Sequence, residues 1–261
     1  DGLNYGSQAG YHGAATLAIL VSDGSLSDLE TVAITVTPGQ STFVWNGDGA
    51  TNDWSDAANW DLDLVPEADD IVVFDVTSSK DALIDTAFAG SVSNIQVFAD
   101  YTGIISQDRA FAVSNQFEID GGTYLTLGFA LDVDSSLTHS GGTLEIFNSQ
   151  VFVGGDFVSS AGGLKIDGSM LTLDGTSDQV LSVLDQLHSL IITNVNTITL
   201  DNELVIAGDL TYGGSKFDTK GYEVVFSGND SQVIDAQNNT FGNVRVDNAS
   251  NLTIVDSLDV D

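Results

Sequence analysis

The chain has 261 residues, no cysteine, and 38 acidic against six basic side chains, which gives a formal net charge of −32 at pH 7. Such a charge repels phosphate groups, so it argues against nucleic acid and anionic membrane surfaces as partners and favours divalent cations. No disulfide framework or thiol chemistry is available. No apolar run reaches the ~18 residues that span a bilayer, so we expect no membrane insertion.

Residues 1–39 are expected to form two strands around a tight turn. Two runs of alternating apolar and polar residues, 15–21 and 31–37, flank the segment that begins with Asp23 and Gly24. Alternation on both sides of an Asp-Gly pair predicts a β-hairpin.

The residues of this hairpin also resemble a known family. Gly-Ala-Ala-Thr-Leu from Gly13, Val-Ser-Asp-Gly from Val21 and Val-Ala-Ile-Thr-Val-Thr-Pro from Val32 look like the last two strands of a cadherin-like, immunoglobulin-type module. Such modules occur as tandem repeats in giant bacterial surface proteins. The resemblance covers about the C-terminal half of one module, and it implies that the earlier strands lie upstream or come from another copy.

Residues 40–105 hold all three tryptophans and are expected to form a cap and the first coils of a solenoid. Trp45, a glycine-rich turn, Trp54, Trp60, Pro66, an acidic turn and an apolar strand follow one another in this order. That order resembles the segment that opens many secreted bacterial β-solenoid domains, including those of autotransporter-like adhesins. Aromatic side chains at this end would cover the core and the unpaired backbone edge of the first coil.

Residues 106–261 are expected to form solenoid repeats. Glycine pairs begin at Gly121, Gly141 and Gly162, and this regular spacing suggests one coil each. The chain also contains a longer sequence repeat, since the segment 171–180 is similar to the segment 224–233, at an offset of 224 − 171 = 53 positions. We call this the long repeat. A fixed period of short apolar strands and polar turns is typical of stacked units, and we interpret the long repeat as a superrepeat of three shorter coils.

These observations predict an all-β chain whose main part is a right-handed parallel β-helix, or β-solenoid. The alternative is an array of β-sandwiches, which also uses alternating strands and Gly/Asn/Asp turns. Sandwich domains do not repeat internally at so short a period, which favours the solenoid. Its core is expected to contain the following apolar positions: Ile192, Leu200, Leu204, Val246 and Leu258.

Acidic residues are the candidate metal ligands. They crowd the turns of the cap and of the hairpin, where carboxylates and carbonyls provide the oxygen ligands that Ca²⁺ requires. The candidates are Asp23, Asp48, Asp53, Asp56, Asp69 and Asp70. The alternative is that Asp and Asn only make turns and solvate the surface. No complete calcium motif is present, so the alternative stays open.

Catalytic residues are not predicted. Some β-solenoids cleave polysaccharides, which needs clustered carboxylates or basic residues with a metal on one face. The basic residues of this chain are scattered, and the three histidines, His12, His139 and His188, fall on different coils. The three tryptophans are expected in the core of the cap and not on a sugar-binding surface.

The sequence therefore predicts a non-catalytic structural or adhesive segment of a large secreted bacterial surface protein, located at the cell surface and stabilised by cations. Its partners would be other copies of itself or extracellular polysaccharide. The alternative function is that of a polysaccharide-binding or polysaccharide-degrading β-helix of the lyase or hydrolase type.

Overall fold

A computed structural model describes residues 13–36, 39–213, 216–237, 239–257 and 259–260. The chain divides into two compact units, residues 1–41 and residues 42–261, and we describe each by itself. The fold is all-β, as predicted. Within the described residues the helical content is a single 3-10 turn, Ala57–Asn59.

The first unit contains an antiparallel hairpin, which confirms the predicted one. Strands β1 (Gly13–Ser22) and β2 (Ser27–Val36) pair along their whole length, from Gly13 opposite Val36 to Ser22 opposite Ser27. Gly24 has φ +91° in the turn, a conformation that favours glycine. The likeness of this hairpin to a cadherin-like module stays a prediction.

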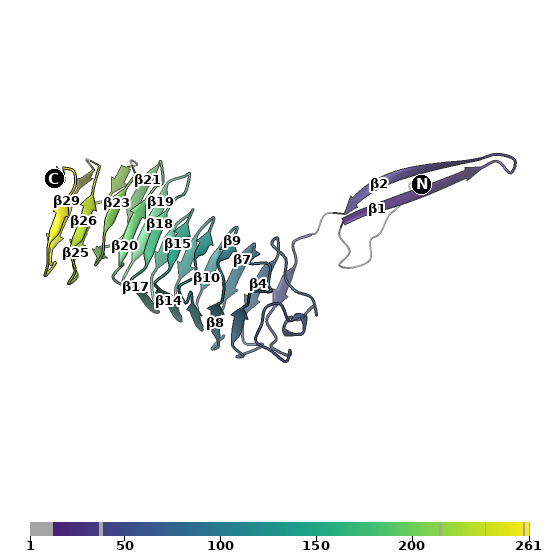
Figure 1. Ribbon diagram of the computed structural model, residues 1–261, viewed down its shortest axis with the longest axis horizontal. Helices are drawn as coiled ribbons and strands as arrows, with labels where there is room; N and C mark the ends of the chain where they lie inside the picture. The colour runs from purple at the N-terminus through teal and green to yellow at the C-terminus, as the bar shows by residue number, and fades with distance from the viewer. Residues whose placement is uncertain (1–12, 37–38, 214–215, 238, 258, 261) are drawn as a thin grey trace. The chain divides into compact units, whose positions relative to one another are not determined.

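The second unit is a parallel β-solenoid with three faces, in which each coil stacks its strands on those of the coil before (Figure 1). The first face is a nine-stranded sheet made of β3 (Thr42–Val44), β4 (Ile71–Phe74), β7 (Asn94–Val97), β10 (Phe117–Ile119), β13 (Leu137–His139), β16 (Phe157–Ser159), β19 (Gln179–Val183), β21 (Thr197–Leu200) and β24 (Lys216–Asp218).

The second face is interrupted once. Its first part is a five-stranded sheet of β5 (Ala82–Ile84), β8 (Ile104–Gln107), β11 (Thr123–Leu125), β14 (Thr143–Phe147) and β17 (Gly163–Asp167), and its later part comprises β22 (Leu204–Ile206), β25 (Glu223–Phe226) and β28 (Asn243–Val246). In the coil between the two parts, a single residue, Leu187, bridges to Ile206.

The third face is again a nine-stranded sheet. It contains β6 (Ser91–Val92), β9 (Phe111–Val113), β12 (Leu131–Val133), β15 (Gln150–Val153), β18 (Met170–Leu173), β20 (Ser189–Ile192), β23 (Leu210–Tyr212), β26 (Gln232–Asp235) and β29 (Leu252–Ile254). Two short strands, β27 (Thr240–Phe241) and β30 (Asp259–Val260), pair with each other.

The core runs along the inside of the coils, because side chains of each strand alternate between the inside and the solvent. Ile192, Leu200 and Leu204 are buried, as predicted. Val246 is 51% exposed, so its prediction as a core residue is wrong. The reason is that Val246 lies on β28, the last strand of its sheet among the described residues. Leu258 lies outside the described residues.

Glycine pairs recur once per coil, as their spacing predicted, and they lie at the corners between the first and second faces. Strands β11 and β14 pair in register from one coil to the next, for example Thr123 with Thr143. Gly142 has φ +63°, and a Cβ there would fall 2.5 Å from the carbonyl oxygen of Gly121 in the preceding coil. Only glycine allows the corners of successive coils to stack this closely.

The interpretation of the long repeat as three coils is wrong. Strand β18 belongs to the third face, whereas its counterpart one long repeat later lies on β25, in the second face. Between β15 and β18, Val151 pairs with Leu171, so one coil takes 171 − 151 = 20 positions. The long repeat therefore corresponds to 53/20, or about two and two-thirds coils. Each copy places its strands one face away from the positions of the preceding copy.

The repeated sequence nevertheless builds the same corner twice. The Gln179 amide donates to the carbonyls of Val153 (2.9 Å) and Gly155, and its Oε1 accepts from the Asn194 amide (2.5 Å). We call this pair, Gln179 with Asn194, the first corner clamp.

Its counterpart, Gln232 with Asn248, is the second corner clamp. The Gln232 amide donates to the carbonyls of Ile206 (3.0 Å) and Gly208 (2.7 Å), and Gln232 Oε1 accepts from the Asn248 amide (2.5 Å). Next to each clamp, paired strands of neighbouring coils are offset by 24 positions, as in Phe157 with Leu181 (181 − 157 = 24) and Leu210 with Ile234, compared with 20 between β15 and β18. The signal in the sequence was therefore a repeated corner and not a repeated face.

Candidate functional site

The three tryptophans form the core of the cap, as predicted. Trp45, Trp54 and Trp60 are fully buried. Trp60 packs edge-on against Trp45 and Trp54, with ring centroids 5.1 and 5.4 Å apart. Trp54 also contacts Phe88 and Phe111 of the first coils, at 5.2 and 5.4 Å. Buried rings of this kind stabilise the end of the solenoid, and they offer no surface to a ligand.

A lysine ties the cap to the coil that follows it. The Lys80 ammonium donates to the carbonyls of Gly47 (3.0 Å) and Gly49 (2.7 Å) and to the Asn59 amide oxygen (2.9 Å). Its own carbonyl accepts from the Trp45 indole (3.0 Å). Three converging oxygens are the kind of ligand set that a bound cation uses, and here an ammonium group occupies it. Sequence reasoning missed this role, because a lone lysine carries no pattern.

The predicted metal ligands of the cap do not converge. Asp48 and Asp69 are exposed, whereas Asp70 is buried and accepts from the Glu67 amide (2.8 Å). Asp56 accepts from the Ala58 amide (3.2 Å) and the Thr51 hydroxyl (3.2 Å). The bond from Ala58 leads the contributions that lower the pKa of Asp56. The carboxylates of Asp56 and Asp70 therefore serve turns.

The two remaining candidates belong to different units of the chain. Asp53 is half-buried, next to the tryptophan core. Asp23 belongs to the hairpin unit, where its carboxylate accepts from the amides of Ser25 (2.9 Å) and Leu26 (2.8 Å). Among the described residues no three acidic or histidine side chains are grouped so that they could hold a metal ion. A specific calcium site stays a prediction.

The histidines differ in their surroundings. His139 is fully buried on β13, where its Nδ1 lies 2.9 Å from the Ser159 hydroxyl of the next coil and its Nε2 has no partner. Burial lowers the pKa of His139 and so favours the neutral ring. His188 is half-buried beside Ser189, at 3.1 Å, on another coil. His12 lies outside the described residues.

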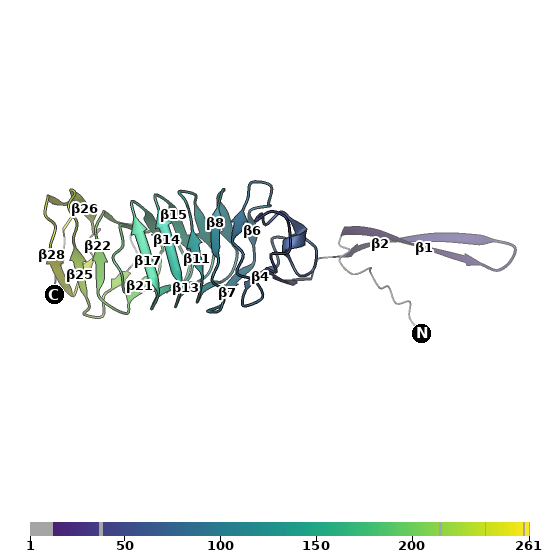
Figure 2. The same ribbon diagram turned by 90° about the horizontal axis from the view of Figure 1, so that it is seen from below.

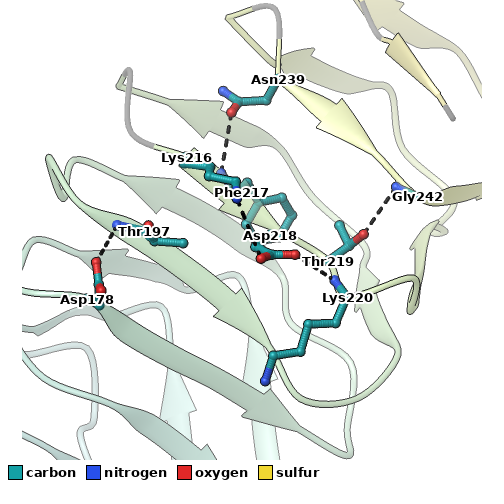
Figure 3. A network of polar contacts seen from close by, with 9 residues as sticks. All are labelled: Asp178, Thr197, Lys216, Phe217, Asp218, Thr219, Lys220, Asn239 and Gly242. Carbon is teal, nitrogen blue, oxygen red and sulfur yellow. Dashed lines mark hydrogen bonds and ion pairs between the residues drawn. The ribbon is translucent and has the colours of Figure 1, made fainter.

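A polar network joins coils near the end of the first face (Figure 3). The Asp178 carboxylate accepts from the Thr197 amide (2.9 Å), and the Thr219 hydroxyl accepts from the Gly242 amide (3.1 Å). Asn239 accepts from the Phe217 amide (3.4 Å). In each case a side chain supplies the acceptor for a backbone amide, so the network holds strands and corners together.

The two lysines of this network are exposed. Lys216 lies 3.7 Å from Asp218, and Lys220 lies 3.7 Å from Asp201. Exposed ion pairs of this kind contribute about 0–1 kcal/mol each. Because both ammonium groups are paired with carboxylates, they do not form a basic surface for an anionic ligand.

Three carboxylates of the third face illustrate the electrostatics of the stacked coils. Burial and the neighbouring Asp134 raise the pKa of Asp174, and burial followed by Asp134 and Asp174 raises that of Asp132. In the cap, burial opposes ionisation of Asp85, but hydrogen bonds from Ser55 and Ala87 outweigh it and lower the pKa. The surroundings therefore disfavour the ionised form of some carboxylates, whereas local hydrogen bonds favour the ionised form of others.

An exposed apolar patch lies on the second face over β11 and β14. Leu125, Leu127, Glu145 and Phe147 line a shallow cavity of about 150 Å³, and we call these four residues the second-face patch. The side chains of Leu127 and Phe147 are 57% and 52% exposed. Figure 2 shows β8, β11, β14 and β17 side by side along this face. The signal in the sequence was apolar residues at outward-facing positions of otherwise alternating strands.

The backbone of Leu127 is unusual. It has φ +50°, in the left-handed region, and Gly128 beside it has φ +88°. In the strand register Gly128 aligns with Asn148 (φ +51°) and Gly168 (φ +63°) of the next two coils, whereas Leu127 aligns with Phe147. Asparagine and glycine adopt this conformation easily, whereas leucine in it costs about 1–2 kcal/mol. A strained and exposed leucine adds nothing to the core.

Buried hydroxyl groups support the patch from inside. Thr126 and Ser149 lie 2.6 Å apart through their hydroxyl oxygens. The Ser149 hydroxyl donates to the Phe147 carbonyl (3.0 Å), and the Gly128 amide donates to the Ser149 hydroxyl (3.1 Å). The backbone that presents Leu127 and Phe147 is therefore fixed by a hydrogen-bonded corner.

Comparisons with known proteins give no assignment, because no family model, curated protein or solved structure matches the chain. No helix among the described residues is long and apolar enough to cross a membrane.

Proposed function

We propose that the chain is a non-catalytic, rigid spacer segment of a secreted bacterial surface protein, which holds neighbouring modules apart. The observation that carries this proposal is the pair of nine-stranded parallel sheets in the solenoid unit. Nine strands with ~4.8 Å between neighbours extend over about 40 Å along the axis. The corner clamps, which bond side chains of one coil to carbonyls of another, support a stiff structure.

The cysteine-free sequence offers a direct test of stiffness, because two introduced cysteines can be spin-labelled without a background. Asp48→Cys and Ser250→Cys place one label at each end of the solenoid unit, on exposed positions. Pulsed electron resonance on the full chain is expected to give a single narrow distance distribution. A broad distribution would contradict the spacer proposal.

The absence of catalysis is proposed on the scattered histidines and the paired lysines. Purified chain, incubated with a panel of neutral and uronate polysaccharides, is expected to release neither reducing ends nor unsaturated uronates. Release of either product would favour the polysaccharide-degrading alternative. Location at the cell surface and stabilisation by cations belong to the same proposal, and melting in CaCl₂ against NaCl of equal ionic strength tests the latter.

A further inference from the structure

We propose that the second-face patch binds one ring of a neutral saccharide, an adhesive function that goes beyond the spacer role. The starting observation is the conformation of Leu127, which is exposed and has φ +50°, a region that asparagine and glycine adopt more easily than leucine. Backbone strain at a residue that adds nothing to core packing points to a function for its exposed side chain. Leu127 and Phe147 together offer an apolar floor beside a carboxylate.

The charge at the patch favours a neutral ligand. The chain carries a net charge of −32, yet Glu145 at the patch is paired with Lys165, whose ammonium lies 3.4 Å from its Oε2. The local charges therefore cancel, so a cationic ligand gains little here, while the surrounding acidic surface repels uronates. The carboxylate can accept hydrogen bonds from sugar hydroxyl groups, and the ammonium can donate to them.

The strand pairing disfavours a peptide as the ligand. β14 pairs with β11 on one side and β17 on the other, and β11 pairs with β8 and β14. An extended peptide would find no free backbone edge at the patch and would bring its own unpaired amides. A sugar ring presents an apolar C–H face to Phe147 and keeps its hydroxyl groups at the wet rim.

The size of the cavity sets the expected strength. A volume of about 150 Å³ is below the ~300–1,000 Å³ of most small-molecule pockets, so a single ring is expected to bind weakly. The hydrogen-bonded corner beneath Phe147 offsets part of this weakness, because a site that is already rigid loses little conformational entropy on binding. A longer saccharide could run along the second face.

The test uses the full chain and defined probes. Hexasaccharides of glucose and of N-acetylglucosamine, with hexagalacturonate as the charged control, are titrated to about 10 mM while NMR shifts are recorded, a range that detects millimolar dissociation constants. At least one neutral probe is expected to bind and to shift the resonances of the patch. The absence of shifts with both neutral probes, or binding of hexagalacturonate alone, would overturn the proposal.

Three variants locate the site. Phe147→Ala is expected to weaken binding at least tenfold, whereas Val195→Ala, which trims another exposed apolar side chain, leaves it unchanged. Leu127→Asn introduces a residue that adopts positive φ more easily, so it is expected to weaken binding without lowering the unfolding midpoint. Unchanged binding in Phe147→Ala, or a lower midpoint in Leu127→Asn, would contradict the proposal. The distance distribution that tests the spacer role is independent of all three results.

Discussion

The two corner clamps make the same hydrogen bonds in different surroundings. Gln179 and Asn194 are fully enclosed, and so is Gln232, but Asn248 is only half-buried. Their neighbours differ more, because Ile192 is fully buried whereas its counterpart Val246 is 51% exposed. The local sequence thus determines the bonding of a corner, and the coils stacked above it determine how much of it water reaches. Changes at matched positions can separate these two contributions.

The largest difference is expected between Ile192→Asp and Val246→Asp. The first places an unpaired charge in the core and should lower the free energy of unfolding by about 3–5 kcal/mol. The second should lower it by less than about 1 kcal/mol, since the side chain already reaches solvent. Urea denaturation of both variants measures this. Equal losses would mean that position in the stack does not control burial.

The next largest effects on stability are expected from substitutions in the clamps themselves. Gln179→Ala removes the side-chain donor to the Gly155 carbonyl and one of two donors to the Val153 carbonyl, which keeps the Asp174 amide. We expect this change to cost about 2–3 kcal/mol. Gln232→Ala removes the same bonds near a more open corner, so we expect about half that loss. A larger drop in the denaturation midpoint for Gln179→Ala than for Gln232→Ala, with unchanged slopes, would support this order. A larger drop for Gln232→Ala would contradict it.

A substitution of Lys80 probes the cap, at the opposite end of the solenoid from the second corner clamp. Lys80→Met removes the ammonium from three oxygens and is expected to destabilise the cap by about 1–3 kcal/mol. Lys165→Met, at an exposed ion pair, serves as the control and should change stability by less than about 1 kcal/mol. Since all tryptophans lie in the cap, their fluorescence reports its melting. Similar fluorescence melts for both variants would remove the special role assigned to Lys80.

The smallest effects concern pH. The folded-state pKa of Asp85 is depressed, so its contribution is complete above the ordinary value of 3.8 and is lost as the pH falls through the lower folded value. The pKa of Asp174 is raised, so its penalty is present at neutral pH and disappears as the pH falls through the raised value towards 3.8.

Substitution should therefore act in opposite directions at the two sites. At pH 7, Asp85→Asn is expected to lower the unfolding midpoint, because it loses a carboxylate that accepts three hydrogen bonds. Asp174→Asn should raise the midpoint slightly at pH 7 and leave it unchanged near pH 3. A rise for both variants at pH 7 would show that net charge, and not the local bonds, controls stability.

Much of the fold could be predicted from the sequence because its signals are local. Glycine pairs at regular intervals define a coil, since a stacked corner tolerates no Cβ at Gly142. The tryptophans of the cap were predicted in the core for their size and spacing. The hairpin followed from alternation around Asp23 and Gly24.

What could not be predicted depends on contacts between coils. The long repeat gives the distance between similar corners, but not the face on which each lies, because all three faces use the same alternating strands. Val246 has a core pattern yet lies on the last strand of its sheet among the residues that the structure describes. The strain at Leu127 and the bonds of Lys80 depend on the backbone path, which no spacing in the sequence reveals.

The repeat of two and two-thirds coils acts as a screw operation. Adding one such unit to the solenoid would lengthen it by about 13 Å at ~4.8 Å per coil and turn everything that follows by a third of a revolution. Three units would restore the original orientation after eight coils. A gene that gains or loses one or two such units would therefore change both the length of the solenoid and the direction in which its distal surface faces. Only a change of three units would alter the length alone.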